Sequence, residues 1–188
     1  MAGLDRYHAK RDLDRSPEPA GGGETGDPDA PRFVIQKHDA RALHYDLRLE
    51  VDGVLRSWAV PKGPSTNPRE KRLAVEVEDH PLEYAGFEGV IGSGYGAGTV
   101  IVWDTGTYRS LTEGDVAAAL DDGHLSVWLE GEKLRGGWTL RRTRGGDKPQ
   151  WLLIKRRDET ADARRNPVST QPESVLSGRT VEEVADDG

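Results

Sequence analysis

The residues best suited to chemistry lie in the segment HYDLRLEV, residues 44–51. In an extended strand, successive side chains point to opposite faces, so His44, Asp46, Arg48 and Glu50 would share one face while the other is mostly apolar. An imidazole and a carboxylate two positions apart can reach one divalent cation. The planar guanidinium of Arg48 suits a pair of phosphate oxygens. The pattern predicts metal-assisted phosphate chemistry, although a solvated polar strand face fits the alternation equally well.

Other polar residues could complete such a site. His38 precedes His44 by six residues, and a bend between them would return it as a third ligand. Because the pKa of histidine ordinarily lies near neutrality, His80 is a candidate proton donor or phosphate partner. Lys62 and Arg72 are candidate phosphate contacts. From spacing alone, a loop histidine and solvated cations remain the simpler interpretations of these last three.

The glycine-rich run GSGYGAG, residues 92–98, is similar in composition to a nucleotide-binding loop. Loops of that kind need a helix N-terminus directly after them. Here residues 99–103, TVIVW, continue as a strand. We therefore interpret the run as a tight loop that at most borders the site.

The elements around these residues have the pattern of an all-β domain. Asp52-Gly53 lies between two alternating runs and predicts a hairpin. Only residues 113–120, EGDVAAAL, look helical. The regular spacing of turn residues between β-type runs favours an antiparallel barrel or sandwich, with all five tryptophans packed in its core. The predicted runs are residues 33–37, 43–51, 55–60, 73–78, 99–103, 125–130, 138–143 and 151–155.

We expect three regions: a mobile N-terminal segment, residues 1–31, that contributes to the site; a β domain, residues 32–157; and an acidic tail, residues 158–188. The tail holds eight acidic and three basic residues, or −5 of the net charge of −7. The rest is near neutral, which favours a local basic site for one strand end over broad duplex binding. In the tail, Val175, Leu176, Val181 and Val184 either form a short docking helix or stay unstructured.

Composition excludes several classes of protein. The chain has no cysteine, so disulfides, zinc fingers and thiolate catalysis are excluded. The N-terminus lacks the apolar core of a secretory signal, and no apolar run reaches membrane-spanning length. We therefore expect a cytoplasmic protein without a membrane partner.

Two long segments make a more specific identification possible. FVIQKHDARALHYDLRLEVDGVLRSWAVPKGPS and RLAVEVEDHPLEYAGFEGVIGSGYGAGTVIVWDTGTY resemble the 3′-phosphoesterase domain of bacterial DNA ligase D and its free-standing relatives. KRDLDRSPEP and WLLIKRRD extend the resemblance to residues 4–158. It implies a small β-barrel. Together with the runs above, we expect an antiparallel barrel with one short helix and mobile N- and C-terminal segments. The implied activity removes a 3′-terminal ribonucleoside and then the 3′-phosphate, leaving a 3′-OH for repair by non-homologous end joining.

The same resemblance assigns roles to individual residues. It implies manganese, with cobalt, zinc or magnesium as substitutes, bound by His38, His44 and Asp46. Phosphate binding and catalysis fall on Arg48, His80 and Tyr84, and the site is lined by Gln36, Lys62 and Arg72. The N-terminal residues implied in diester cleavage are Arg11, Asp12 and Glu18. Leu13 and Ser16 depart from the family pattern, which has an aromatic residue and a threonine at these positions. Both lie in the N-terminal segment, so they affect the expectation of diester cleavage and not that of the metal site.

The implied partners are DNA or RNA/DNA 3′ ends on a primer-template, a ligase or polymerase, and an end-bridging protein. We expect a nucleoid-associated monomer. Polymerase and ligase motifs are absent from the sequence, and the initial methionine with an acidic tail favours a free-standing enzyme over an excised domain.

Two other functions compete with this one. A cupin-like barrel acting on a small molecule would explain HxD followed by Glu50, but cupins carry HxH and a later histidine block after a PxG turn. An inactive DNA-end adaptor would not need intact metal ligands beside Arg48. Both alternatives therefore fit the residues less well than the phosphoesterase.

Overall fold

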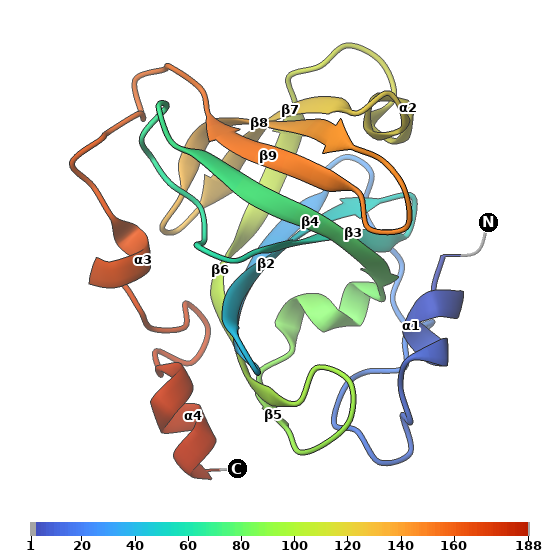
Figure 1. Cartoon of the computed structure of the whole chain (residues 1–188). Helices are drawn as coiled ribbons and strands as arrows, with labels where there is room; N and C mark the ends of the chain where they lie inside the picture. Colours follow the sequence, from blue (N-terminus) through green and yellow to red (C-terminus); the bar gives the residue numbers. More distant parts are fainter. Residues whose placement is uncertain (1–2, 188) are drawn as a thin grey trace.

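The fold is a closed antiparallel β-barrel. We analysed a computed structural model, which describes residues 3–187. The strands follow the order β1-β2-β3-β4-β9-β8-β7-β6-β5, and β1 also pairs with β6, so that eight strands close the barrel while β5 lies along a free part of β6 (Figure 1). The strands are β1 (Arg32–Asp39), β2 (Leu43–Val51), β3 (Val54–Val60), β4 (Lys71–His80), β5 (Gly89–Ile91), β6 (Gly98–Ser110), β7 (His124–Gly131), β8 (Arg135–Arg144) and β9 (Gln150–Lys155). The barrel prediction is confirmed, and the sandwich alternative is wrong.

The strand prediction is confirmed for every run, and the three-residue β5 is the strand it missed. The β2–β3 hairpin turns at Asp52-Gly53, whose φ angles are 51° and 84°. Positive φ at both positions is what a tight type I′ turn requires. This turn fixes the register of β2 against β3, with Val51 opposite Val54.

Short helices are more numerous than the single one predicted. The predicted helix is α2 (Val116–Asp121), capped by the Asp115 side chain, which accepts from the Ala118 amide at 3.2 Å. The others are α1 (Asp5–Ala9), the 3₁₀ helix η1 (Leu82–Gly86), α3 (Pro167–Thr170) and α4 (Val181–Asp187). Helices this short are stabilised by packing, which periodicity does not reveal. Within residues 3–187, no helix is long and apolar enough to cross a membrane.

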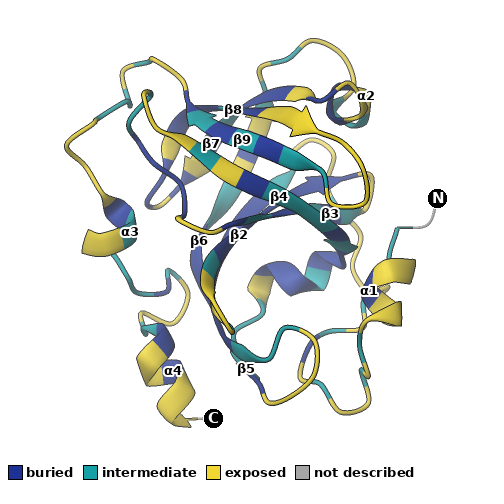
Figure 2. Ribbon diagram, in the orientation of Figure 1, coloured by how far each residue is buried: buried dark blue, intermediate teal, exposed yellow. Residues whose placement is uncertain are grey.

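The barrel interior is the main core. Leu47 and Leu49 point into it from β2, and Trp58 meets Trp151 edge to face with ring centroids 5.7 Å apart. Buried residues mark the interior in Figure 2. Trp128 corrects the expectation that all five tryptophans lie in the core: it is half-buried, with the Arg109 guanidinium over its ring.

A second, smaller core lies on the outer face of the barrel. Val34, Leu55 and Val102 point outward there and are covered by Leu82 of η1 and Tyr7 of α1. The face of β2 that carries His44, Asp46 and Arg48 is this outer face. It is therefore a covered surface between the barrel and a cap, which consists of η1 and the N-terminal segment with α1. The solvated-face interpretation is wrong.

Both terminal segments, which we expected to be mobile, contact the barrel. Residues 16–29 form no helix or strand, as expected, yet Glu18 is buried. At the other end, Val181 and Val184 of α4 are buried against Ile101. The docking-helix alternative is confirmed for Val181 and Val184, whereas Val175 and Leu176 lie outside α4 and Leu176 is exposed.

A close approach of β6 and β7 yields a prediction about stability. Gly106 faces Gly131, and a Cβ at residue 106 would lie 1.9 Å from the Glu130 carbonyl oxygen. Because both strands are paired inside a closed barrel, neither can easily move away. Gly106→Ala should lower the free energy of unfolding by about 1–3 kcal/mol in denaturant titrations. Gly145→Ala, with no neighbouring atom within 4 Å, is the control; equal midpoints for the two variants would contradict this account.

Candidate metal and phosphate site

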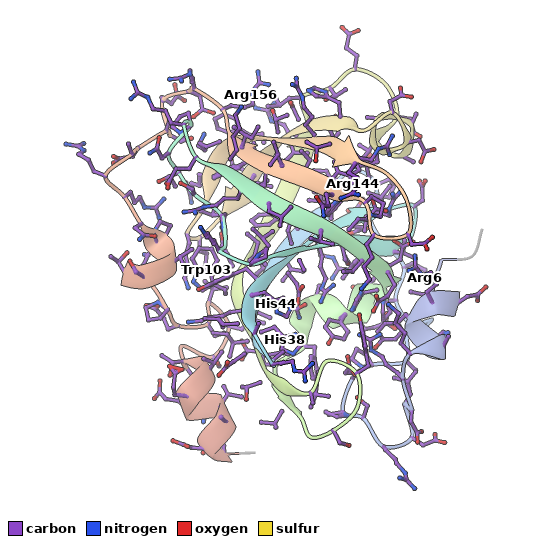
Figure 3. All side chains as sticks on the ribbon, viewed as in Figure 1. Arg6, His38, His44, Trp103, Arg144 and Arg156 are labelled. Carbon is purple, nitrogen blue, oxygen red and sulfur yellow. The ribbon has the colours of Figure 1, made fainter. Side chains whose placement is uncertain are left out.

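A pocket of about 270 Å³ opens on the outer face of β1, β2 and β4, beneath the cap. Figure 3 shows His38 and His44 close together at the lower part of the barrel. The predicted residues that line this pocket are Arg11, Glu18, His38, His44, Asp46, Arg48, His80 and Tyr84. The pocket therefore brings together predicted residues that are up to 73 positions apart, from Arg11 to Tyr84.

Strand pairing explains why the two histidines meet. In the β1–β2 hairpin, His38 is directly opposite His44, and Gln36 is opposite Asp46. The Asp46 Oδ2 atom lies 3.2 Å from His44 Nε2 and 3.6 Å from His38 Nδ1. One ligand atom from each of the three residues lies within 4.8 Å of the other two. The bend expected between His38 and His44 is thus the turn of this hairpin.

Backbone carbonyls orient both imidazoles. His44 Nδ1 is 3.0 Å from the Ala42 carbonyl oxygen, and His38 Nε2 is 2.7 Å from that of Gly96. A carbonyl can only accept, so each of these nitrogens donates, and the other nitrogen of each ring faces Asp46. Ligands on one ion at bonds of about 2.0–2.2 Å lie roughly 3–3.5 Å apart. The two distances to Asp46 are close to this range, so the three residues could hold a divalent transition metal. The carbonyls are outer hydrogen-bond partners of the kind that metal-bound histidines use.

The charges around Asp46 favour an ionised ligand. Burial by itself would raise the pKa of Asp46, but the Arg48 guanidinium and hydrogen bonds with His38 and His44 hold it well below its ordinary value. For His44, burial opposes the charged form, yet Asp46 outweighs it and raises the pKa. A metal ion that binds here must displace the proton shared between these groups.

Arg48 lines this pocket and has one guanidinium donor without a partner. Its Nε donates to Gln36 Oε1 at 2.8 Å, and its Nη2 lies 3.5 Å from Asp46 Oδ2. Nη1 is buried without a hydrogen-bond partner among the described residues. Leaving a buried donor unpaired costs about 1–3 kcal/mol, which an incoming phosphate oxygen would recover. Gln36 lies behind Arg48, held by the Tyr84 and Phe87 carbonyls, and positions it without lining the pocket.

His80 also lines the pocket, and its surroundings favour the neutral imidazole. Burial, together with the Arg48 and Arg11 cations, holds its pKa well below the ordinary value. Its Nδ1 donates to the Glu78 carbonyl oxygen at 3.0 Å, and its Nε2 accepts from Arg11 Nη2 at 3.3 Å. The one acceptor nitrogen of the resting imidazole is therefore occupied by Arg11.

The N-terminal segment reaches the pocket through buried ion pairs. Arg11 donates to Glu18 at 2.9 Å and to Glu78 at 3.1 Å, and the Tyr84 hydroxyl donates to Glu18 at 2.7 Å. Glu78 was not among the predicted residues. A register shift between β3 and β4 lets Val77 and Glu78 line the same pocket, which strict alternation forbids.

The remaining predicted residues lie outside this pocket. Asp12 lines an adjoining chamber, and Lys62 and Arg72 share a separate cavity of about 230 Å³ with Lys71. The glycine-rich loop borders the site, as expected, and it contributes the Tyr95 side chain as well as the Gly96 carbonyl. The position of Tyr95 between glycines could have indicated a pocket residue in the sequence. The Gly96 carbonyl could not be predicted in this way, because it belongs to the backbone.

The ion pairs of Arg11 predict how the N-terminal segment is held. Arg11→Met would leave Glu18 and Glu78 short of a partner, and breaking a buried pair costs about 3–5 kcal/mol. Amide hydrogen exchange in residues 5–18 should accelerate strongly in this variant. Arg15→Met, which alters a side chain that is 89% exposed, should leave the exchange unchanged. Unaltered protection in Arg11→Met would show that the pairs do not hold the segment.

Comparison with known proteins identifies the family. Residues 36–142, more than half of the chain, match the family described as the DNA Ligase D 3′-phosphoesterase domain. A multifunctional non-homologous end joining protein LigD from Pseudomonas aeruginosa is 52% identical over 183 residues, which cover 95% of this chain and 22% of the relative. LigD of Mycobacterium tuberculosis is 46% identical over 160 residues, or 83% of this chain and 20% of the relative. The chain spans about a fifth of the length of these relatives. It belongs to the DNA ligase D 3′-phosphoesterase domain family.

Proposed function

We propose that this phosphoesterase domain is metal-dependent and clears 3′ ends of DNA strands for non-homologous end joining. The observation that carries the proposal is the convergence of His38, His44 and Asp46 beside the unpaired Nη1 of Arg48. Metal ligands next to a free guanidinium donor match a phosphate ester better than an uncharged small molecule. The relatives are named as end joining proteins, which supports DNA ends as the substrate.

The proposed reaction is hydrolysis at the terminal phosphorus. A divalent ion such as Mn²⁺, held by His38, His44 and Asp46, would supply Lewis acidity toward a nonbridging oxygen. Arg48 Nη1 donates to a second oxygen and stabilises the charge that develops there. Water adds to phosphorus, and the bond to the leaving oxygen breaks. With a 3′-phosphate the leaving oxygen is O3′, and with a 3′-terminal nucleoside it is the O5′ of that nucleoside.

His80 would transfer the proton, and Tyr84 and a group of cationic side chains would position the phosphate and the strand. His80 would act once its Nε2 gives up the hydrogen bond from Arg11. It would then take a proton from water and return it to the leaving oxygen. Tyr84, fixed by Glu18, orients the phosphate beside Arg48. Lys62, Lys71 and Arg72 would hold the strand backbone through their shared cationic cavity.

This proposal gives three regions of the chain different roles. Residues 32–157 would form the catalytic barrel, and residues 1–31 would complete its site through Arg11 and Glu18. Residues 158–188 would support β6. The cupin-like alternative loses its basis because the second ligand histidine comes from β1 and His80 faces Arg11. An inactive adaptor would bind the same DNA ends without hydrolysing them, so only a turnover assay separates it from the proposed enzyme.

Metal binding and turnover should fail together when one ligand is removed. His44→Ala should weaken Mn²⁺ binding by at least about 10-fold to 100-fold, as measured by calorimetry. Mutation of a residue that only hydrogen-bonds a metal ligand already weakens metal binding by this much. Release of phosphate from a 3′-phosphate primer should fall at least as much. His124→Ala, which changes an exposed histidine on β7, is the control.

The primer assay should be run with manganese, magnesium, cobalt and zinc, and with a chelator. The wild-type chain should be inactive in chelator and active with one or more of the ions. Full activity of His44→Ala would remove the metal from the mechanism, and a wild-type chain that binds primers without turnover would establish the adaptor.

A further inference from the structure

The hairpin of β8 and β9 concentrates positive charge that the rest of the chain lacks. Residues 135–157 contain eight basic residues and one acidic residue, a net charge of +7. Residues 1–134 carry a net charge of −9. The near-neutral total for residues 1–157 is therefore the sum of two strongly charged parts, and the positive part is a single hairpin.

Most of this positive charge is exposed and unpaired. Seven of the eight basic side chains are exposed, and Lys155 is the buried one. None of the seven forms an ion pair within the part of the chain that the structure describes. Arg135 and Arg142 donate to backbone carbonyls. The other five make up what we call the cationic surface: Arg141, Arg144, Lys148, Arg156 and Arg157. Because like charges repel, such a surface favours a polyanionic partner.

Strand pairing connects the cationic surface to the metal and phosphate pocket. Residues directly opposite each other in neighbouring strands share one face of a sheet. Arg144 of β8 is opposite Gln150 of β9, which is opposite Val75 of β4. Val75 shares its face with Val77, two positions along the strand, and Val77 lines the pocket. Two strand spacings separate Arg144 from Val75, so the first cation lies roughly 10 Å from the strand that borders the pocket.

The cationic surface continues from Arg144 along β9. Arg141, Arg156 and Arg157 border an open depression of about 530 Å³, and no carboxylate of the described residues lines it. Arg144 lies beside the first residue of β9, and Arg156 follows its last. Six strand residues extend for about 20 Å, which is roughly the length of six base pairs. In Figure 3, Arg144 and Arg156 both lie above the two labelled histidines.

We propose that the cationic surface binds the sugar-phosphate backbone of the DNA duplex behind the 3′ end that lies in the pocket. The inference rests on the proposed function and adds a second contact with the same substrate. An acidic protein is the other polyanion that could bind here. Specific protein interfaces are depleted of charged residues at their centre, whereas this surface is charged along its whole length. Backbone contacts carry no sequence information, which suits an enzyme that must accept ends of any sequence.

The test compares two double variants that lose the same charge. Arg141→Gln/Arg144→Gln removes two cations from the cationic surface, and Arg109→Gln/Arg164→Gln removes two exposed arginines from other parts of the chain. The probe is a labelled duplex with a 3′-OH end, whose binding is followed by fluorescence anisotropy at several salt concentrations. A duplex of about 12 base pairs is roughly 40 Å long and spans both the pocket and the cationic surface.

Loss of phosphate contacts should change both the affinity and its dependence on salt. Each contact contributes about 0.9 to the slope of log K against log salt. Arg141→Gln/Arg144→Gln should therefore lower the magnitude of the slope by about 1.8 and weaken binding at low salt by at least about tenfold. The control pair should keep the slope of the wild type. Thermal melts establish that both variants are folded.

Turnover provides a second measurement. Both double variants are assayed with manganese on a 3′-phosphate duplex and on a 3′-phosphate mononucleotide, which is too small to reach the cationic surface from the pocket. Arg141→Gln/Arg144→Gln should lose more kcat/KM on the duplex than on the mononucleotide, and chiefly through a higher KM.

The possible results separate this inference from the proposed function. Equal affinities and equal salt slopes in the two double variants would overturn the cationic surface as a duplex contact. Polyglutamate binding that requires Arg141 and Arg144, with unchanged duplex binding, would also overturn it and would indicate an acidic protein partner. Salt-dependent duplex binding that requires these arginines, in a chain that releases no phosphate with any metal, would support the surface and overturn the proposed function.

Discussion

The site depends on one buried charge, the Asp46 carboxylate. It is 5% exposed, and an ionised carboxylate in such a place is tolerated only when it is paired. Arg48, His38 and His44 supply that pairing within 3.6 Å. The same arrangement that satisfies Asp46 places two imidazole nitrogens and a guanidinium around one small volume. Metal and phosphate would therefore bind to the same side chains that the fold already needs in order to pair the buried Asp46 carboxylate.

The closed barrel is what holds this arrangement rigid. His38 and His44 are opposite each other because β1 and β2 pair in fixed register, and β1 is also paired with β6. The interior core fixes the other face of β2 through Leu47 and Leu49. The cap covers part of the outer face, with Arg11 and Glu18 joining the N-terminal segment to His80 and Tyr84. The candidate site therefore lies on the outside of the barrel, between its strands and an N-terminal segment that is distant from His80 and Tyr84 in sequence.

Local patterns predicted much of this structure. Alternation in residues 44–51 separated the core face from the site face correctly, and Asp52-Gly53 located the hairpin. The features that were missed are long-range ones. Glu78 enters the pocket through an irregularity in β4, and the Gly96 carbonyl that orients His38 has no signature in the side chains. The docking of α1 and η1 also depends on burial of single aromatic residues, such as Tyr7 and Tyr84, which short segments do not reveal by periodicity.

The central claim is that His38, His44 and Asp46 bind one metal ion. A crystal grown with Mn²⁺ and measured for anomalous scattering tests it most directly. The account predicts a single strong peak bonded to His38 Nδ1, His44 Nε2 and an Asp46 oxygen at about 2.0–2.3 Å, near the range for nitrogen and oxygen ligands of such ions. A peak bound elsewhere, or none at saturating Mn²⁺, would contradict it.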